Sequence, residues 1–363
     1  MPPSPPFRSD APPARLLAVR LGAVGDVVRT LPAVRLLRRT WPAARIAWAV
    51  EPGAAPLVIG HPDIDEVIVL DRRALEGRAW RRPLAALGTL RRFVAALSGF
   101  APALSLDFQS SFKSGLVARL SGAPVRVGFD APQDREGSHR FANHRVLLPE
   151  PRISRVLRAA ALARAAGASE GPLVADLALS AEDHRLAEAE RARLAGDARL
   201  VAIAPFSSLR QAWKRYPAER WTAIAAGLAA RGLAVAVVGG PAEQEEARAL
   251  CAAAGTGVLP TAPLSLKPLA ALLGRADLVI SGDTGPMHLA WAAGAPVIAI
   301  YGPTDPVLNA PWGEGHAVLA PARPTSRDDA DKFPGLGPDL VLEHALARLA
   351  AAPGARPMEK TSC

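Results

Sequence analysis

Short apolar runs alternate along the chain with longer segments whose apolar residues recur at helical spacing. Residues 16–21 and 44–50 are apolar enough for buried strands, and residues 26–39 between them place their apolar side chains on one helical face. The same alternation returns in the second half, where strands are expected at 200–205 and 233–239. Strands that alternate with helices are typical of parallel sheets covered by helices, so the pattern predicts an α/β protein with two doubly wound, Rossmann-like domains.

The pattern also indicates the limits of the two domains. A polar stretch near residue 170 is followed by an Ala/Glu/Arg-rich segment at 181–194 that is expected to be helical. We therefore expect one domain at residues 14–180 and a second at residues 181–352. The proline-rich residues 1–13 are expected to form a disordered tail, and residues 353–363 a loose one.

Residues 281–306 carry the strongest signal for a binding site. An apolar run precedes this block, a loop of small residues leads from it into a helical segment, and a second apolar run ends at another small-residue loop that begins with Gly302. Both loops follow the carboxyl ends of predicted strands, where open parallel sheets bind ligands. The start of the helix offers backbone N–H groups, the hydroxyl of Thr284 and close approach at Gly285. His288 lies one turn later, where ligand contact is expected and a buried helix residue is the alternative. The block predicts a site for a phosphorylated ligand.

Asp26 is a second candidate, because it follows a loop with Gly22 and Gly25 at the end of the first predicted strand. Aspartate at a helix start is most often an N-cap. The same carboxylate, if it faces a ligand, can instead accept a proton, and the two glycines would let a substrate approach. The loop lacks the Gly-Lys-Ser/Thr that completes a P-loop, so ATP hydrolysis is not indicated.

Three stretches resemble motifs of one enzyme family and occur in that family's order: residues 20–33, 213–221 and 281–306. The last, with Asp283-Thr284-Gly285 and Gly302-Pro303-Thr304, resembles the donor-binding block of the ADP-heptose:lipopolysaccharide heptosyltransferases. These are glycosyltransferase family 9, whose architecture is GT-B. The resemblance spans about residues 15–350.

The resemblance implies two domains that face a cleft, with the activated sugar on the C-terminal domain and the acceptor on the N-terminal one. The implied reaction is the inverting transfer of a heptose from ADP-heptose to the lipopolysaccharide inner core, with Kdo-lipid A or a heptosyl acceptor. Asp26 is then the general base that takes the proton of the acceptor hydroxyl, and Lys214 stabilises the departing diphosphate. No cofactor or metal is implied, since no Asp-x-Asp motif stands in a loop after a strand.

Further residues complete the expected donor site. The family's Pro-Gly-Ala is replaced by Pro205-Phe206 followed by Ser207 and Ser208, whose hydroxyls can still bind phosphate. Glu243 is the candidate for the ribose hydroxyls, although acids at this position also complement a helix dipole. Asp283 is expected to organise the backbone of its loop.

On the acceptor side the resemblance is weaker. Arg155 resembles a family arginine, but the histidine that the family has four residues earlier is replaced by Pro151. The acceptor's identity, the heptose position that is built, the sugar itself and the oligomeric state are not determined by the sequence.

The charge of the chain suggests an anionic partner. The formal net charge is +9, and residues 72–93 concentrate arginines among apolar side chains. This segment favours attraction to an anionic membrane, where a lipid-linked acceptor lies, and a general bias toward arginine is the alternative. No nucleic-acid motif accompanies the charge, so nucleic acid is not an expected partner. The absence of an apolar run of about 18 residues, of a secretory signal and of paired cysteines favours a cytoplasmic protein, peripheral at the inner face of the inner membrane.

Two rival functions remain open at this point. One is another nucleotide-sugar enzyme of the same architecture, such as a different glycosyltransferase or a sugar 2-epimerase. The other is a non-catalytic nucleotide-sugar-binding protein, which would have no need of the predicted base at Asp26.

Overall fold

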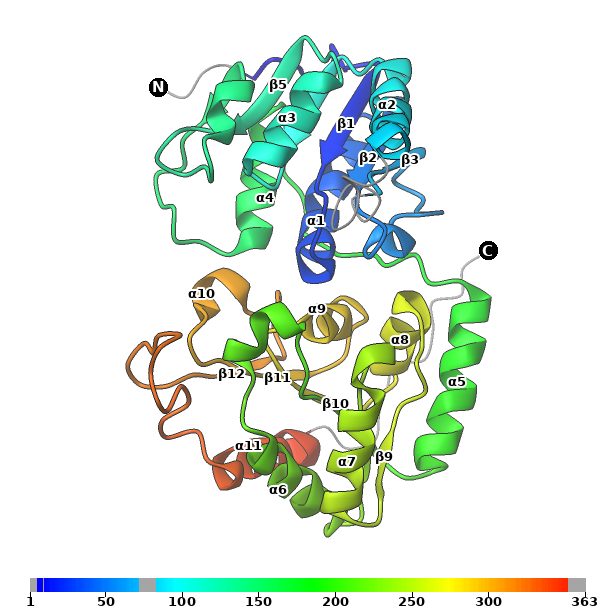
Figure 1. Cartoon of the computed structure of the whole chain (residues 1–363), viewed down its shortest axis with the longest axis vertical. Helices are drawn as coiled ribbons and strands as arrows, with labels where there is room; N and C mark the ends of the chain where they lie inside the picture. The colour runs from blue at the N-terminus through cyan, green and yellow to red at the C-terminus, as the bar shows by residue number, and fades with distance from the viewer. Residues whose placement is uncertain (1–4, 9, 72–82, 352–363) are drawn as a thin grey trace. The chain divides into compact units, whose positions relative to one another are not determined.

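A computed structural model describes residues 5–8, 10–71 and 83–351 of the chain (Figure 1). These residues form two compact units. The N-terminal unit contains Met1–Ser180 and, in addition, Val307–Trp312, and the C-terminal unit contains Ala181–Pro306 and Gly313–Cys363. Within the described residues, no helix combines the length and the apolar character needed to cross a bilayer.

The N-terminal unit is built on a six-stranded sheet with the order β3-β2-β1-β4-β5-β6. Every pair of neighbouring strands is parallel. The strands are β1 (Arg15–Val19), β2 (Arg45–Val50), β3 (Glu66–Val69), β4 (Leu104–Asp107), β5 (Val125–Phe129) and β6 (His144–Val146). The helices are α1 (Val24–Thr40), α2 (Pro83–Phe100), α3 (Phe112–Leu120) and α4 (Arg155–Ala165).

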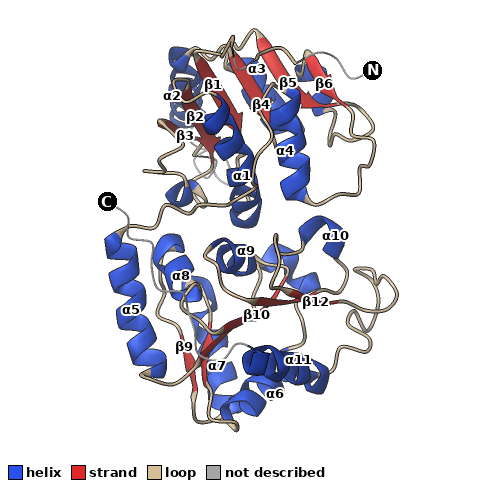
Figure 2. Cartoon of the chain, turned by 180° about the vertical axis from the view of Figure 1, so that it is seen from behind, coloured by secondary structure: helices blue, strands red, loops and turns tan. Residues whose placement is uncertain are grey.

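Helices cover both faces of this sheet (Figure 2). α2 and α3 pack on the face that carries Leu17 and Val19 of β1, where Phe93, Leu97 and Val117 join one apolar cluster. α1 packs against α4. The central strands are almost wholly buried, as parallel strands with helices on both faces must be, which is why they stand out in the sequence as continuous apolar runs.

The C-terminal unit repeats this plan with the order β12-β11-β10-β7-β8-β9. Its strands, also parallel throughout, are β7 (Leu200–Ala204), β8 (Ala234–Val237), β9 (Val258–Pro260), β10 (Leu278–Gly282), β11 (Val297–Ile300) and β12 (Ala317–Leu319). Its helices are α5 (Ala181–Ala195), α6 (Ala218–Ala229), α7 (Gln244–Ala254), α8 (Leu266–Leu273), α9 (Gly285–Ala292) and α11 (Pro338–Ala351). α6, α7 and α11 share one apolar cluster with β7 and β8, whereas α8 packs against α5 and α9.

Counted from the first strand of each unit, both sheets have the doubly wound order 3-2-1-4-5-6. The prediction of two doubly wound α/β domains is therefore confirmed. In this architecture the loops after β1, β4, β7 and β10 lie at the carboxyl ends of adjacent central strands, where the strand order reverses. Ligands bind at this switch point in open parallel sheets.

Two details differ from the sequence-based expectations. The proposed disordered tail is wrong for Phe7 and Arg8, because the Phe7 ring packs edge-on against Trp41 at 6.3 Å and the indole of Trp41 donates to the Arg8 carbonyl at 3.1 Å. The second difference is the segment Val307–Trp312, which belongs to the N-terminal unit although it lies inside the range expected for the second domain. Residues 353–363 lie outside the described residues.

Candidate active site

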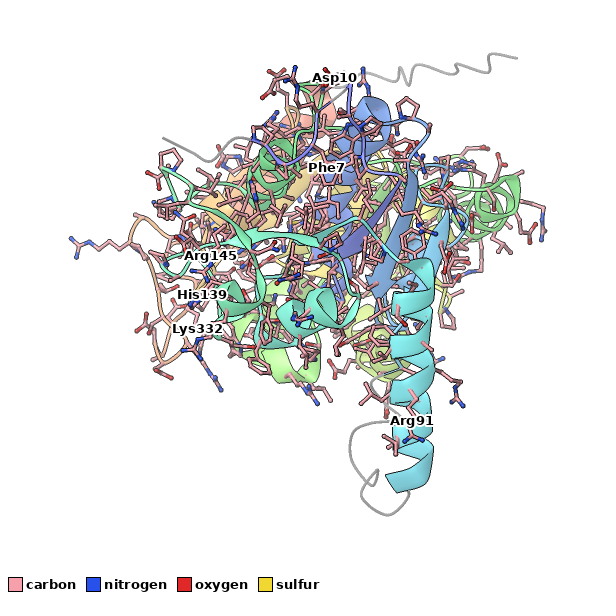
Figure 3. All side chains as sticks on the ribbon, turned by 90° about the horizontal axis from the view of Figure 1, so that it is seen from above. Phe7, Asp10, Arg91, His139, Arg145 and Lys332 are labelled. Carbon is pink, nitrogen blue, oxygen red and sulfur yellow. The ribbon has the colours of Figure 1, made fainter. Side chains whose placement is uncertain are left out.

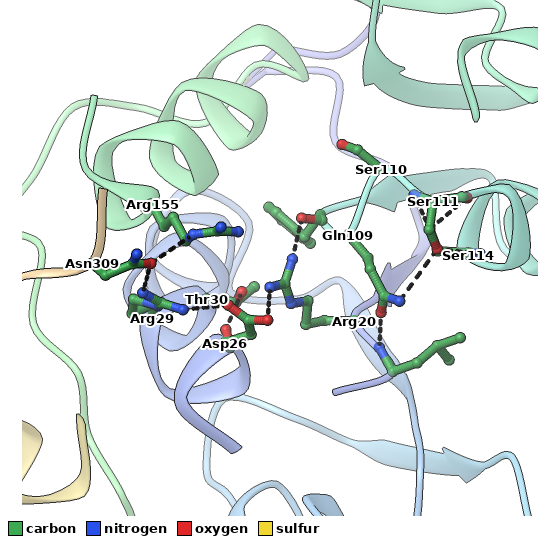
Figure 4. A network of polar contacts seen from close by, with 12 residues as sticks. Arg20, Asp26, Arg29, Thr30, Gln109, Ser110, Ser111, Ser114, Arg155 and Asn309 are labelled. Atoms are coloured by element: carbon green, nitrogen blue, oxygen red, sulfur yellow. Dashed lines mark hydrogen bonds and ion pairs between the residues drawn. The ribbon is translucent and has the colours of Figure 1, made fainter. Parts of the chain in front are cut away.

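Asp26 lies in the first turn of α1 and is bound by two arginines (Figure 4). Arg20, just after β1, places its Nη2 2.6 Å from Oδ2 of Asp26, and Arg29, one turn along α1, donates from Nη2 to Oδ1. The N-cap of α1 is Ala23, and no side chain caps the helix there. The alternative interpretation of Asp26 as an N-cap is therefore wrong, and its carboxylate is committed to cations instead of backbone.

The network extends beyond this carboxylate in both directions. Arg20 also donates from Nη1 to the carbonyl of Phe108 at 2.7 Å. Arg29 donates from Nη1 to Oδ1 of Asn309 at 2.7 Å, and Arg155 donates from Nε to the same oxygen at 2.9 Å. Cationic and oxygen-bearing side chains thus alternate along one line (Figure 4). The structure places the predicted acceptor-side residue Arg155 in the same network as Asp26.

A cavity of about 160 Å³ opens beside this network within the N-terminal unit. Arginine is the commonest residue type in its lining, which includes Arg20, Arg29, Arg135, Arg155 and Arg158. Asp26 is the carboxylate among the lining residues, so the cavity carries a large excess of positive charge. Such a cavity suits a ligand with carboxylate or phosphate groups, which guanidinium groups bind with two parallel hydrogen bonds.

The arginines and the carboxylates alter each other's protonation. Burial by itself would raise the pKa of Asp26, but the charges of Arg20 and Arg29, together with Arg155, outweigh it and hold the pKa well below its usual range. Burial, with the neighbouring charges of Arg155 and Arg20, lowers the pKa of Arg158 to about 10. Asp26 is consequently ionised at neutral pH, in the form that can accept a proton, but it is a weak base in this arrangement.

A second buried carboxylate, Asp107, lies at the end of β4 next to this site. Its Oδ1 accepts hydrogen bonds from the backbone N–H groups of Gln109 and Ser110, both at 3.0 Å. These bonds shape the loop that carries Phe108, whose carbonyl holds Arg20. Asp107 did not emerge as a candidate from the sequence, although it is the last residue of an apolar strand, and the loop that leads to Asp26 also follows an apolar strand.

The two glycines predicted on the acceptor side have different surroundings. Gly25 is buried within the first turn of α1. Gly22 lies in the loop before that helix, and a Cβ atom there would meet nothing closer than Oε2 of Glu51 at 4.0 Å. Packing therefore does not require glycine at residue 22.

In the C-terminal unit, Asp283 lies between two of the other predicted site residues. Nζ of Lys214 is 3.7 Å from Oδ2 of Asp283, and Nε2 of His288 is 3.8 Å from Oδ1. The other ring nitrogen of His288 accepts a hydrogen bond from the indole of Trp291 at 3.1 Å. That bond leaves Nε2 as the protonated nitrogen of the neutral ring, which therefore directs an N–H toward Asp283.

Thr284 is the N-cap of α9, and Gly285 is the first residue of that helix. No side chain caps α9 at its start, and the hydroxyl of Thr284 lies 3.1 Å from that of Ser281. The predicted geometry, in which a helix begins directly after β10, is present. Asp283, Thr284 and Gly285 thus occupy the switch point of the C-terminal sheet.

The remaining donor-side candidates differ in their exposure and in their hydrogen bonds. The hydroxyl of Ser207 donates to the carbonyl of Gln211 at 3.0 Å, whereas Ser208 is exposed. Glu243 ends a short 3₁₀ helix after β8 and is half-buried. Gly302 follows β11, and a Cβ atom there would lie 2.6 Å from Cε1 of Phe333, so close packing by itself accounts for glycine at this position.

Comparison with known proteins identifies the family. The family model described as glycosyltransferase family 9 (heptosyltransferase) matches residues 91–332. Lipopolysaccharide heptosyltransferase 1 of Escherichia coli K12 is 30% identical over 315 residues, which are 85% of this chain and 94% of that protein. The chain belongs to glycosyltransferase family 9. The same-named protein of Pseudomonas aeruginosa is 30% identical over 310 residues, or 84% of this chain and 83% of that protein.

Solved structures of family 9 share the fold. E. coli heptosyltransferase WaaC with ADP is 27% identical with a TM-score of 0.73, and the match covers 92% of this chain and 99% of that one. The family 9 glycosyl transferase of Veillonella parvula has a TM-score of 0.77 at 21% identity, over 93% of this chain and 98% of that one. The family and the GT-B fold predicted from the sequence are confirmed, and the chain is a glycosyltransferase.

The rival classes are not favoured. A UDP-N-acetylglucosamine 2-epimerase from Listeria monocytogenes matches with a TM-score of 0.53 at 14% identity, a likeness of fold alone.

Proposed function

We propose that this family 9 enzyme transfers a heptose, with inversion, from ADP-heptose to the inner core of lipopolysaccharide. The observation that carries this proposal is the 30% identity, over 85% of the chain, to a lipopolysaccharide heptosyltransferase 1. Relatives with that name reach 29% to 31% identity, against 24% to 25% for those named lipopolysaccharide heptosyltransferase 2. We therefore propose Kdo-lipid A, in preference to a heptosylated acceptor, as the substrate that receives the sugar.

In this proposal Asp26 is the general base on the acceptor side. Its carboxylate lines the cavity and is ionised, as a base must be before it takes a proton. Its low pKa makes it a poor base while Arg20 and Arg29 hold it. An anionic acceptor that binds the same guanidinium groups would weaken that hold and strengthen the base as the substrate arrives.

The arginine-lined cavity would receive the negatively charged part of the acceptor. Arg20 and Arg29 are each less than a tenth exposed, and their Nε atoms are buried without a hydrogen-bond partner. Burying such donors costs free energy unless a ligand or ordered water satisfies them. The parts of these guanidinium groups that line the cavity would bind a carboxylate or phosphate of the acceptor.

On the donor side, Lys214 would stabilise the charge that develops on the departing ADP. Thr284 and Gly285 would bind the diphosphate at the start of α9, and Asp283, toward which the buried His288 directs Nε2, would orient Lys214. The hydroxyls of Ser207 and Ser208 and the backbone at Gly302 would add contacts, and Glu243 would accept from the ribose. We propose that no metal or cofactor takes part, because a side-chain cation and helix N–H groups offer the charge that the diphosphate needs.

The decisive experiment is a transfer assay with purified enzyme, synthetic ADP-heptose and two acceptors, Kdo-lipid A and its heptosylated form. We expect mass spectrometry to show one added heptose on Kdo-lipid A, and NMR to show inversion at the anomeric carbon. Activity should survive EDTA. Conversion of the nucleotide sugar without an acceptor, or transfer of a different sugar only, would refute the proposed function.

We also propose that the protein is cytoplasmic and binds the anionic inner face of the inner membrane. Of the basic segment predicted at 72–93, residues 72–82 lie outside the described residues. On α2, Arg91 and Arg92 are exposed, and Arg91 is labelled in Figure 3. Phe93 was expected among the interleaved apolar contacts to lipid, but it is buried against β1 and β2, so it is not available for that purpose.

The membrane proposal predicts that Arg91→Gln with Arg92→Gln weakens binding to vesicles of phosphatidylglycerol and phosphatidylethanolamine at low salt. Polybasic attraction is about 1 kcal/mol per residue and is screened by salt. Arg231→Gln with Arg323→Gln, which removes two exposed charges from the C-terminal unit, is the matched control. Equal loss in both double variants would mean that overall charge, and not α2, attracts the protein.

A further inference from the structure

The segment Val307–Trp312 joins the N-terminal unit although the chain on both sides of it belongs to the C-terminal unit. It begins directly after Pro306, at the end of the loop that follows β11 and carries Gly302. Its first half lies in the short helix α10 (Pro306–Asn309), and its far end is held by the indole of Trp312, which donates to the Leu173 carbonyl at 3.1 Å. The far end of the segment is therefore anchored to the N-terminal unit.

Asn309 is the residue of this segment that reaches the Asp26 network. Its side chain is 8% exposed, and its Oδ1 accepts from Arg29 at 2.7 Å and from Arg155 at 2.9 Å (Figure 4). One amide oxygen thus serves two guanidinium groups. Because both partners can only donate, the oxygen and not the nitrogen of the amide must face them.

The position of Asn309 decides where Arg29 can lie. Arg29 uses Nη1 for Asn309 and Nη2 for Asp26, so the two acceptors lie at opposite sides of one planar guanidinium. Without Asn309, the charges of Arg29 and Arg155 would repel each other with no oxygen between them. The acceptor at residue 309 therefore keeps two like charges close together and one of them oriented toward the carboxylate.

An amide also suits this place better than a carboxylate would. A neutral acceptor separates the two arginines without competing strongly for their charge. A carboxylate at residue 309 would form ion pairs with both and draw Arg29 away from Asp26.

We propose that Asn309 is a positioning residue for Asp26: it fixes Arg29 and Arg155 so that the carboxylate is held in place until an acceptor binds. The link to catalysis rests on the proposed function, in which Asp26 is the base. The physical link between Asn309 and Asp26 does not depend on it. The charged groups that face Asp26 are Arg20 from the end of β1, Arg29 from α1 and Arg155 from α4, with Arg135 and Arg158 in the same cavity.

The kinetic test compares Asn309→Leu, which keeps the size but removes the acceptor, with Asn309→Asp, which keeps the acceptor and adds charge. In the heptose-transfer assay we expect Asn309→Leu to lower kcat at least tenfold with the KM for ADP-heptose within threefold. We expect Asn309→Asp to retain more activity and to move the acidic limb of the kcat–pH profile upward, because Arg29 is drawn from Asp26. Trp312→Phe, which removes a hydrogen bond of the same segment away from the arginines, should leave kcat and the pH profile within twofold of wild type.

A double-mutant cycle tests the physical link without any activity. Thermal unfolding is measured for Asn309→Leu, Asp26→Asn and the double variant, and the cycle is repeated with Trp312→Phe in place of Asn309→Leu. If Asn309 acts through Arg29 on Asp26, the double variant of the first cycle should lose less Tm than the sum of the two single variants. In the second cycle, the loss of the double variant should equal that sum.

Additive losses in the first cycle would overturn the proposal, as would a kcat of Asn309→Leu within twofold of wild type. Equal kinetic losses in Asn309→Leu and Trp312→Phe, with an unmoved pH profile, would also overturn it by showing a purely structural role. A wild-type enzyme that transfers no heptose would instead refute the proposed function, and the cycle would still decide whether Asn309 and Asp26 are linked.

Discussion

Replacing Asp107 by asparagine is expected to stabilise the protein at neutral and alkaline pH and to leave its stability in acid unchanged. The carboxylate is 5% exposed at the end of β4. Burial raises its pKa to about 6, although the bonds from Ser114, Ser110 and Gln109 and the charge of Arg20 favour the ionised form. Asparagine has the same shape, stays neutral at every pH, and can accept the two backbone hydrogen bonds through its own Oδ1.

The sign and size of the effect follow from the linkage of protonation to folding. A carboxyl whose pKa is higher in the folded than in the unfolded protein stabilises the fold fully below the unfolded value, about 3.9, and loses this contribution as the pH rises through 6. The difference of about two pKa units, at 1.36 kcal/mol per unit, corresponds to about 3 kcal/mol. Asp107→Asn should therefore gain up to about 3 kcal/mol in the free energy of unfolding at pH 8, and about zero at pH 4.

Urea unfolding at pH 4, 6 and 8, followed by tryptophan fluorescence, measures this difference for wild type and Asp107→Asn. Asp134→Asn is the control of opposite sign. Burial acts to raise the pKa of Asp134, but hydrogen bonds from the backbone and ring of His139 outweigh it and lower the pKa, so that carboxylate stabilises the fold above its unfolded pKa. Asp107→Asn with wild-type stability at pH 8, or with a gain that persists at pH 4, would refute the reasoning.

Three further outcomes test the site. Asp26→Asn should abolish transfer while calorimetry shows ADP affinity within a few-fold of wild type; a parallel loss of ADP binding would give Asp26 a structural role. Lys214→Ala should lower the single-turnover rate by about 2.7 to 4 kcal/mol of activation free energy and affect donor affinity less, and a raised KM at unchanged kcat would contradict this. Gly302→Ala should lower Tm and weaken ADP binding because its Cβ would lie 2.6 Å from the Phe333 ring, whereas Gly337→Ala, with nothing within 4 Å, should match wild type.

The sheets could be predicted from the sequence because their strands are buried on both faces. Residues 16–19 and 200–204 form unbroken apolar runs and are the central strands β1 and β7. The loops that follow these runs and β10 must then lie at the switch point of a doubly wound sheet. The apolar pattern and this topology together are enough to locate Asp26 and the start of α9.

The partners of Asp26 were only partly predictable. Arg29 lies three residues after Asp26 on a predicted helix, so their contact follows from helical spacing. Arg155 came from family resemblance alone. Asn309 could not be found, because nothing in the local pattern of residues 307–312 tells which of the two sheets a returning loop will pack against.

The alternation of arginines with Asp26 and Asn309 makes acceptor binding and base strength depend on one set of groups. The guanidinium groups of Arg20 and Arg29 lower the basicity of Asp26, and the same groups line the cavity proposed for the acceptor's anion. An anion that binds them therefore changes more than affinity, since each bond it takes from Asp26 raises the pKa of the base toward its usual value. Binding energy used in this way appears in kcat instead of KM. An acceptor of the same shape without its negative charge should consequently react slowly even when its concentration saturates the enzyme. If the cavity only bound the acceptor, the uncharged acceptor would have a higher KM but an unchanged kcat.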